Sequence, residues 1–205
     1  MGVRNIALAL DLDYLPKRIS RREIFSLRSL SQGSVNFLVL APERDVNASS
    51  INDYIAEASI RCITDSISLA RDLRSKLCVV DLGYPTLDLE SFRVRFRRAL
   101  HTVLSTGYGL ICVKLSQPDL QANLLSPEVP VAVYLEDLKS LNGRKRKVEV
   151  VIVEAPFDDR RAELLKELRG FEGYLLLRPA EPKYSEELLK TYLSYLRRFL
   201  AGLEL

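Results

Sequence analysis

Acidic residues stand directly after several apolar runs of the sequence, and they are the first candidates for chemistry. Asp11 and Asp13 follow residues 5–10, and Asp81 follows residues 77–80. Carboxylates at the end of a strand can hold Mg²⁺, the ion that supports phosphoryl transfer. The residues after Asp13 do not continue a phosphotransferase motif. We therefore favour a solvated strand end and keep as an alternative an α/β phosphotransfer or hydrolase enzyme that uses Asp11, Asp13 or Asp81.

Basic clusters indicate a second kind of chemistry, the binding of phosphate backbones. One cluster crowds a predicted helix at residues 93–98, and another forms a continuous run in a predicted turn at residues 144–147. Four like charges repel one another unless an anion neutralises them, and such an interaction weakens steeply as salt rises. For the second cluster a solvated loop is the favoured interpretation, and nucleic-acid binding is kept beside it. The nucleic-acid-binding candidates are Arg93, Arg97, Arg98, Arg144, Lys145, Arg146 and Lys147.

Apolar runs alternate with helical patterns along the chain, and these elements must position the candidate residues. Strands are predicted at 5–10, 35–40, 60–63, 77–80, 110–115, 131–135, 148–153 and 174–177. Helices are predicted at 21–30, 49–58, 67–74, 85–107, 160–169 and 185–203. This alternation predicts one α/β domain over residues 1–205, a mostly parallel central sheet with helices on both faces. Asn142-Gly143 indicates an antiparallel hairpin at the C-terminal edge of that sheet.

Four short segments follow one another in an order found in a known superfamily: Gly33–Pro42, Ile63–Ser66, Leu77–Asp81 and Gly109–Lys114. They resemble strands of RecA-like ATPases, the RadA and KaiC branch especially. In this resemblance Asp65 is the acid that ends the second strand, and Asp81 is the Walker B-like aspartate. The resemblance covers about residues 12–157 and implies a RecA-like fold with a C-terminal antiparallel hairpin.

The same resemblance places the phosphate loop GxxxxGK[ST] on residues 41–48. That loop needs glycines whose backbone amides wrap the phosphates, a lysine for the terminal phosphates and a hydroxyl for Mg²⁺. Glu43 and Asp45 add charge of the wrong sign. The resemblance therefore implies a pseudo-ATPase with a degenerate loop, no catalytic residue, no metal and no cofactor. The positions that should carry the two glycines, the lysine and the hydroxyl are, in order, Ala41, Val46, Asn47 and Ala48.

The composition is that of an ordinary globular protein. Of 205 residues, 47% are hydrophobic and 28% charged, with a net charge of +3, which excludes disorder and a disulfide scaffold. The single histidine, His101, and three scattered cysteines exclude a His-rich metal site. No run approaches the ~20 apolar residues of a membrane span. Buried thiols predict a cytoplasmic protein, and the excess of Arg over Lys fits a thermophilic source.

The main functional hypothesis is a non-catalytic RecA-like protein that acts through protein–protein assembly in DNA recombination or repair. Its expected partner is an active RecA-like ATPase, and contact with DNA or RNA stays open, as does a homo-oligomer; no membrane is expected. The alternatives are a subunit of an RNA-processing or tRNA-modifying complex and the α/β enzyme described above.

Overall fold

The computed structural model contains seven strands in one sheet, in which every neighbouring pair is parallel and the spatial order is the sequence order. It describes residues 5–10, 18–32, 35–85, 88–141, 147–154 and 159–178, together with 190, 194 and 197. The strands are β1 (Asn5–Ala9), β2 (Asn36–Leu40), β3 (Leu77–Asp81), β4 (Ile111–Lys114), β5 (Val131–Tyr134), β6 (Val148–Glu154) and β7 (Tyr174–Arg178).

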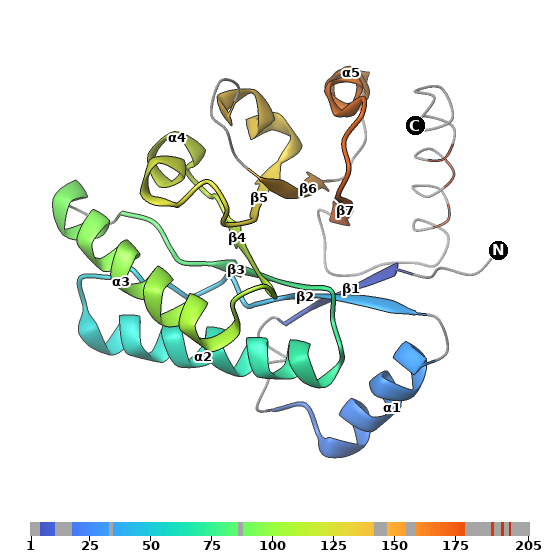
Figure 1. Ribbon diagram of the computed structural model, residues 1–205, viewed down its shortest axis with the longest axis horizontal. Coiled ribbons are helices and arrows are strands. Elements are labelled where there is room, and N and C mark those ends of the chain that lie inside the picture. Colours follow the sequence, from blue (N-terminus) through green and yellow to red (C-terminus); the bar gives the residue numbers. More distant parts are fainter. Residues whose placement is uncertain are drawn as a thin grey trace.

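Helical segments connect the strands and lie around the outside of the curled sheet (Figure 1). The two longest begin at side-chain caps: Asn52 accepts hydrogen bonds from two amides of α2, and Asp88 does the same for α3. Among the described residues, no helix is long and apolar enough to cross a membrane. The segments are α1 (Arg21–Gln32), α2 (Asp53–Asp72), α3 (Leu89–Gly107), α4 (Pro118–Gln121), η2 (Ala122–Leu124), η3 (Leu135–Leu141), α5 (Asp159–Leu165) and η4 (Lys166–Leu168).

Strand side chains divide between two apolar layers because successive residues of a strand point to opposite faces. Val39, Cys78 and Val113 face outward and pack in one cluster with Phe92 and Phe96 of α3. The alternate residues form an inner cluster that runs from β2 to β7, so the sheet is curled into a nearly closed barrel with a filled interior. The inner cluster consists of Leu38, Leu40, Leu77, Val79, Cys112, Ala132, Val150, Ile152 and Leu176.

The predicted C-terminal hairpin is wrong. β5 and β6 pair in parallel, so the connection between them, of which η3 is the described part, crosses back to the edge of the sheet where β5 begins. A parallel crossover needs a dozen or more residues, and this connection is long enough. Burial of β5 and β6 among apolar neighbours also favours parallel pairing. The Asn142-Gly143 signal lies outside the described residues.

The predicted strand at residues 60–63 is also wrong, and the two helices predicted on either side of it belong to a single helix. One helix, α2, runs from Asp53 to Asp72. Its buried residues recur every three or four positions, which is the period of a helix rather than of a strand. They are Ala56, Ser59, Ile63, Ser66, Ile67, Leu69 and Ala70.

Candidate active site at the carboxyl ends of the strands

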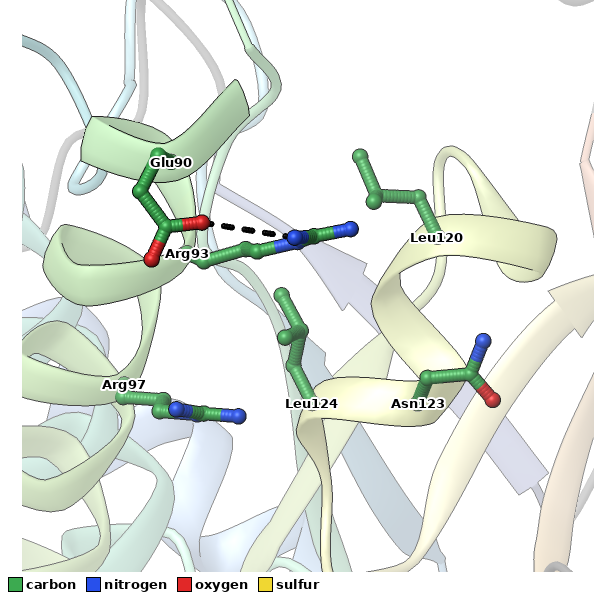
Figure 2. A pocket seen from close by; sticks show the side chains of 6 residues that line it. All are labelled: Glu90, Arg93, Arg97, Leu120, Asn123 and Leu124. Atoms are coloured by element: carbon green, nitrogen blue, oxygen red, sulfur yellow. Dashed lines mark hydrogen bonds and ion pairs between the residues drawn. The ribbon is translucent and has the colours of Figure 1, made fainter. Parts of the chain in front are cut away.

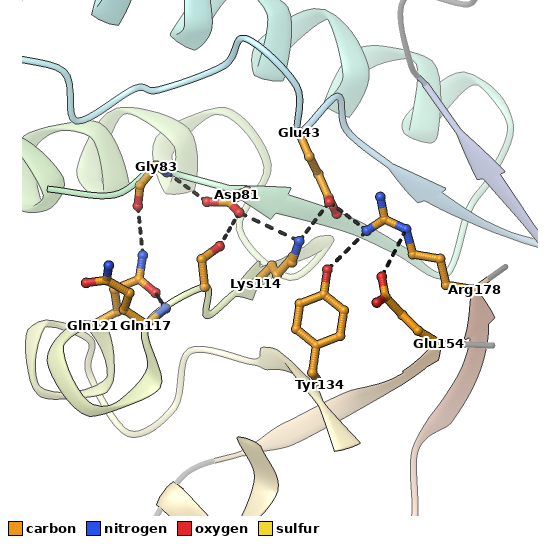
Figure 3. Close-up of polar contacts among 10 residues, drawn as sticks. Glu43, Asp81, Gly83, Lys114, Gln117, Gln121, Tyr134, Glu154 and Arg178 are labelled. Carbon is orange, nitrogen blue, oxygen red and sulfur yellow. Dashed lines mark hydrogen bonds and ion pairs between the residues drawn. The ribbon is translucent and has the colours of Figure 1, made fainter. Parts of the chain in front are cut away.

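Polar side chains stand at the carboxyl end of six consecutive strands, β2 to β7. In a barrel of parallel strands these ends lie at one mouth, although the residues are far apart in the sequence. Figure 3 shows the side chains directed toward one another across this mouth. In strand order they are Glu43, Asp81, Lys114, Tyr134, Glu154 and Arg178.

Glu43 is the centre of this cluster. Its Oε2 accepts a hydrogen bond from Lys114 Nζ at 2.7 Å and another from Arg178 Nη1 at 2.7 Å. The Arg178 contact joins the loop after β2 to the end of β7, across the barrel. Arg178 Nη1 also lies 3.2 Å from the Tyr134 hydroxyl, and its Nε lies 3.8 Å from Glu154 Oε1. Lys114 Nζ lies 4.8 Å from the centre of the Tyr134 ring, a cation–π contact.

Asp81 forms the other arm of the cluster. Its Oδ1 accepts a hydrogen bond from the Gly83 amide at 2.8 Å, and its Oδ2 lies 3.8 Å from Lys114 Nζ. The Ser116 hydroxyl donates to Oδ2 of the same carboxylate. Lys114 therefore lies between two carboxylates, and only 5% of its side chain is exposed.

Charge pairing fixes the ionisation of the central residues. Burial would raise the pKa of Glu43, but the Lys114 ammonium and the Arg178 guanidinium outweigh it and hold that pKa below its ordinary value. Burial would lower the pKa of Lys114, but Glu43 and Tyr134 outweigh it and hold that pKa above its ordinary value. Lys114 is therefore a cation at neutral pH, suited to stabilising an oxyanion and unsuited to attack as an amine.

Neighbouring loops hold the cluster in place. Gly83 adopts φ +98°, and a Cβ there would lie 2.0 Å from Asn47 Oδ1. The Asn47 side chain donates to the Tyr84 carbonyl at 3.2 Å, which ties the loop after β2 to the loop after β3. Buried Gln121 donates to the Gly83 carbonyl at 2.8 Å and accepts from the Gln117 amide at 2.8 Å. The loops after β2, β3 and β4 are thus connected behind the site.

The four positions predicted to form a degenerate phosphate loop have structural roles. The Ala41 amide donates to the Val79 carbonyl at 2.8 Å and so continues the sheet. Val46 packs against the core, Ala48 is buried, and the Asn47 amide donates to Ser59 Oγ at 2.8 Å. The functional candidate in this segment is Glu43, which the resemblance to a phosphate loop treated only as charge of the wrong sign.

The predicted acids are not brought together. Asp65 lies on α2 and ends no strand, so its interpretation as a second-strand acid is wrong. Asp81 does end β3, as predicted, and contacts Lys114 rather than a phosphate loop. Asp11 and Asp13 lie outside the described residues.

The two basic clusters lie in different places. Arg93 and Arg97 line a pocket on the outer surface, and Arg98 is exposed on the same helix. Lys147 precedes β6, at the end of that strand opposite the mouth, and pairs with Glu149 at 2.7 Å. Arg144, Lys145 and Arg146 lie outside the described residues.

Buried cysteines and the single histidine lie away from the mouth contacts. Burial raises the pKa of the Cys78 thiol to about 12, and it raises the pKa of Cys112 as well. His101 is exposed on α3. Among the described residues, no group of three or more His, Cys, Asp and Glu side chains is placed to hold a metal ion.

Solved structures with a similar fold identify the architecture. A D-tagatose 3-epimerase-like protein aligns with a TM-score of 0.80 and 17% identity, over 100% of this chain and 91% of that one. Endonuclease IV from Thermus thermophilus aligns with a TM-score of 0.66 and 14% identity, over 97% of this chain and 99% of that one. The fold is a TIM barrel.

A third match, a xylose isomerase domain protein from Planctomyces limnophilus, has a TM-score of 0.69 and 10% identity, over 98% of this chain and 88% of that one. No protein-family model and no curated protein matches the sequence. The TIM barrel overturns the RecA-like expectation, and with it the pseudo-ATPase interpretation. At these identities the comparisons establish the fold alone.

Sequence reasoning missed most of the mouth cluster, although a signal was present. Lys114, Glu154 and Arg178 each stand directly after an apolar run, as Asp81 does. Substrate sites of parallel barrels lie at the carboxyl ends of the strands. In a barrel, that rule selects these residues together.

Proposed function

We propose that this chain is an enzyme of the sugar isomerase and epimerase kind, which binds a small carbohydrate at the barrel mouth and moves a proton on it. The observation that carries the proposal is the network of six strand-end side chains built around the Glu43–Lys114 ion pair. Closely spaced donors and acceptors suit the hydroxyl groups of a sugar. The names of the similar structures, a D-tagatose 3-epimerase-like protein and a xylose isomerase domain protein, support the same substrate class.

The residues divide between charge stabilisation and proton transfer. Lys114 and Arg178 are cations that can face a carbonyl oxygen of the sugar. Glu43 is a weak base because both cations lower its pKa. Glu154 is the mouth carboxylate most accessible to a substrate, since its side chain is 39% exposed, against 20% for Glu43 and 11% for Asp81, and its 3.8 Å contact with Arg178 Nε is looser than those of Glu43. Among the mouth carboxylates we therefore assign Glu154 as the general base.

The proposed step balances without an oxidant or reductant. The proton on the carbon next to the carbonyl passes to Glu154, and the electron pair of the broken C–H bond moves onto the carbonyl oxygen. Lys114 and Arg178 stabilise the resulting enediolate. Return of a proton to the opposite face of the same carbon re-forms the carbonyl and gives the epimer. Return of a proton to the former carbonyl carbon, with transfer of the neighbouring hydroxyl proton to the enediolate oxygen, gives the isomer.

Proton exchange with solvent tests this proposal directly. Ketoses and aldoses incubated with the protein in D₂O should gain deuterium at the carbon next to the carbonyl, as followed by NMR. Loss of a general base lowers a rate by about 10²–10⁴-fold, so Glu154→Gln should slow the exchange by about that factor. Glu149→Gln, at the other end of β6, is the matched control and should retain the rate. Absence of exchange for every sugar, or equal rates in the two variants, would contradict the proposal.

A further inference from the structure

A pocket of about 270 Å³ lies on the outer surface between α3 and the α4–η2 segment (Figure 2). Its polar lining consists of Glu90, Arg93 and Arg97 from α3 and Asn123 from η2, and its apolar lining consists of Leu120 and Leu124. Figure 2 shows both guanidinium groups extending from α3 toward the α4–η2 segment. The lining of this pocket shares no residue with the mouth cluster.

The helical register separates the arginines of α3 into two groups. Arg95 turns toward the start of α2, where it donates to Asp53 Oδ1 at 2.6 Å and to the Ser50 carbonyl at 3.0 Å. Arg93 and Arg97 are four residues apart and therefore share the face that lines the pocket. Two like charges at this spacing disfavour the helix unless a negative group lies beside them.

The pocket compensates only one of these two charges. Arg93 Nη1 lies 3.3 Å from Glu90 Oε2. Arg97 has no hydrogen-bonding or ion-pair partner within the described part of the chain. Glu90 and Arg93 cancel, so the lining retains the positive charge of Arg97. The Asn123 amide nitrogen donates to the Asp119 carbonyl at 3.1 Å, and that hydrogen bond holds the η2 wall.

We propose that this pocket binds a small organic phosphate. A guanidinium presents a planar set of donors that matches phosphate oxygens and can bind them in a bidentate manner. Leu120 and Leu124 give the organic part of such a ligand an apolar surface. The pocket is bounded by one face of α3 and by the α4–η2 segment. A space of this size suits a single small anion better than an extended nucleic-acid backbone. The inference stands on this pocket alone and is independent of the proposed sugar chemistry.

Calorimetric titration at constant ionic strength tests this site, with phenyl phosphate and inorganic phosphate as probes. Saturable binding of phenyl phosphate is expected in the unmodified protein, with weaker binding of inorganic phosphate. A hydrogen bond to a charged group contributes enough that Arg97→Gln should weaken binding by at least about tenfold. Arg98→Gln removes the same charge from the same helix outside the pocket lining and should leave binding unchanged. Circular dichroism of both variants verifies that the fold is retained.

Three results would overturn the proposal. The first is no saturable binding of either probe. The second is equal weakening by Arg97→Gln and Arg98→Gln, which would indicate diffuse charge rather than a site. The third is binding of a DNA or RNA oligonucleotide that depends on Arg97 while phenyl phosphate fails to bind, which would make the surface a nucleic-acid contact.

Discussion

Two cations meet at the barrel mouth, Lys114 and Arg178, and two meet over the pocket between α3 and α4, Arg93 and Arg97. At the mouth each cation contacts the Glu43 carboxylate at 2.7 Å, and Lys114 is 5% exposed. At the pocket one cation pairs at 3.3 Å with a carboxylate that is 77% exposed. The cations inside the barrel are therefore bound to carboxylates of the protein. On the surface, Arg97 is left available to a ligand.

The difference follows from the solvation of charge. A buried ion loses its water and must regain that interaction from an opposite charge, whereas an exposed pair contributes little because water and salt screen it. The mouth should therefore control stability as well as chemistry, and the pocket should affect binding only. The following predictions test this division, starting with the largest effect.

Removing the buried ammonium should have the largest effect. Lys114→Met leaves the buried Asp81 without its cation and leaves Glu43 with Arg178 as its remaining partner, and breaking a buried pair costs about 3–5 kcal/mol. The free energy of unfolding from urea titration measures the loss. The double variant Glu43→Gln with Lys114→Met removes both charges and should recover a large part of it. A Lys114→Met protein within about 1 kcal/mol of the original would contradict the account, because surface substitutions have effects of that size or less.

Substitution by alanine should destabilise the protein more at Gly83, which lies behind the mouth, than at Gly109. Gly83→Ala combines φ +98° with a Cβ placed 2.0 Å from Asn47 Oδ1, and strain with overlap should cost roughly 2–4 kcal/mol. Gly109 has φ +90° with nothing within 4 Å of its Cβ, so Gly109→Ala carries the backbone strain alone. Thermal unfolding of the two variants separates the two costs. Equal losses would mean that the Asn47 contact adds nothing.

Acid should reduce the contribution of the mouth residues to the free energy of unfolding. The pKa of Glu43 lies below its ordinary value of 4.5 in the folded protein, so its stabilising effect is complete above that value and is lost as the pH falls through the folded-state pKa. The pKa of Lys114 lies above its ordinary 10.5, so its effect is complete below that value and is lost at higher pH. Unfolding measured from pH 6 to pH 3, in steps of about one unit, should show a steeper loss in the original protein than in the Glu43→Gln, Lys114→Met double variant. Parallel profiles would contradict this assignment.

Tyr134 should have a smaller effect. Tyr134→Phe removes the hydroxyl near Arg178 but retains the ring near Lys114, so the loss is about that of one hydrogen bond, 0.5–1.5 kcal/mol. Tyr108 is 76% exposed, and Tyr108→Phe provides a matched control in urea titration. A loss as large as that of Lys114→Met would show that Tyr134 carries the network.

The smallest change in stability is expected at the pocket. Arg97→Gln removes an exposed charge and should alter the free energy of unfolding by less than about 0.5 kcal/mol, while it abolishes most phosphate binding. Urea titration and calorimetry on one preparation give both values. A loss of several kcal/mol would show that Arg97 is part of the structure and would remove the contrast with the mouth.

Most strands could be predicted from the sequence, because continuous apolar runs such as residues 77–80 and 148–153 mark buried parallel strands. Residues 60–63 contain three apolar residues and one arginine, a stretch too short to separate a strand from a helix, and only the longer pattern through Ile67 identifies the helix. The hairpin was predicted because a local turn signal outweighed the length of the connection. Strand order is set by tertiary packing, which a local pattern does not contain.

The candidate site could be predicted only in part. Asp81 was identified because it ends a strand, but its partner Lys114 was not. Glu43 and Lys114 are 71 residues apart, and Glu43 and Arg178 are 135 apart. Nothing in the sequence near Glu43 indicates that β4 and β7 face it, since closure of the barrel creates the cluster. The arginines of α3 form a recognisable basic cluster in the sequence, but only the fold gives Arg95 and Arg97 different roles.

The central claim is that the mouth is the substrate site and the α3–α4 pocket is a separate one. Amide chemical shifts recorded by NMR during titration with a ketose, and in a parallel titration with phenyl phosphate, test it most directly. The ketose should shift the amides of Gly83, Lys114 and Ser116 and leave those of Arg97 and Asn123 unchanged, while phenyl phosphate should do the reverse. If a ketose that binds shifts the Arg97 and Asn123 amides and leaves the three mouth amides unmoved, the claim is wrong.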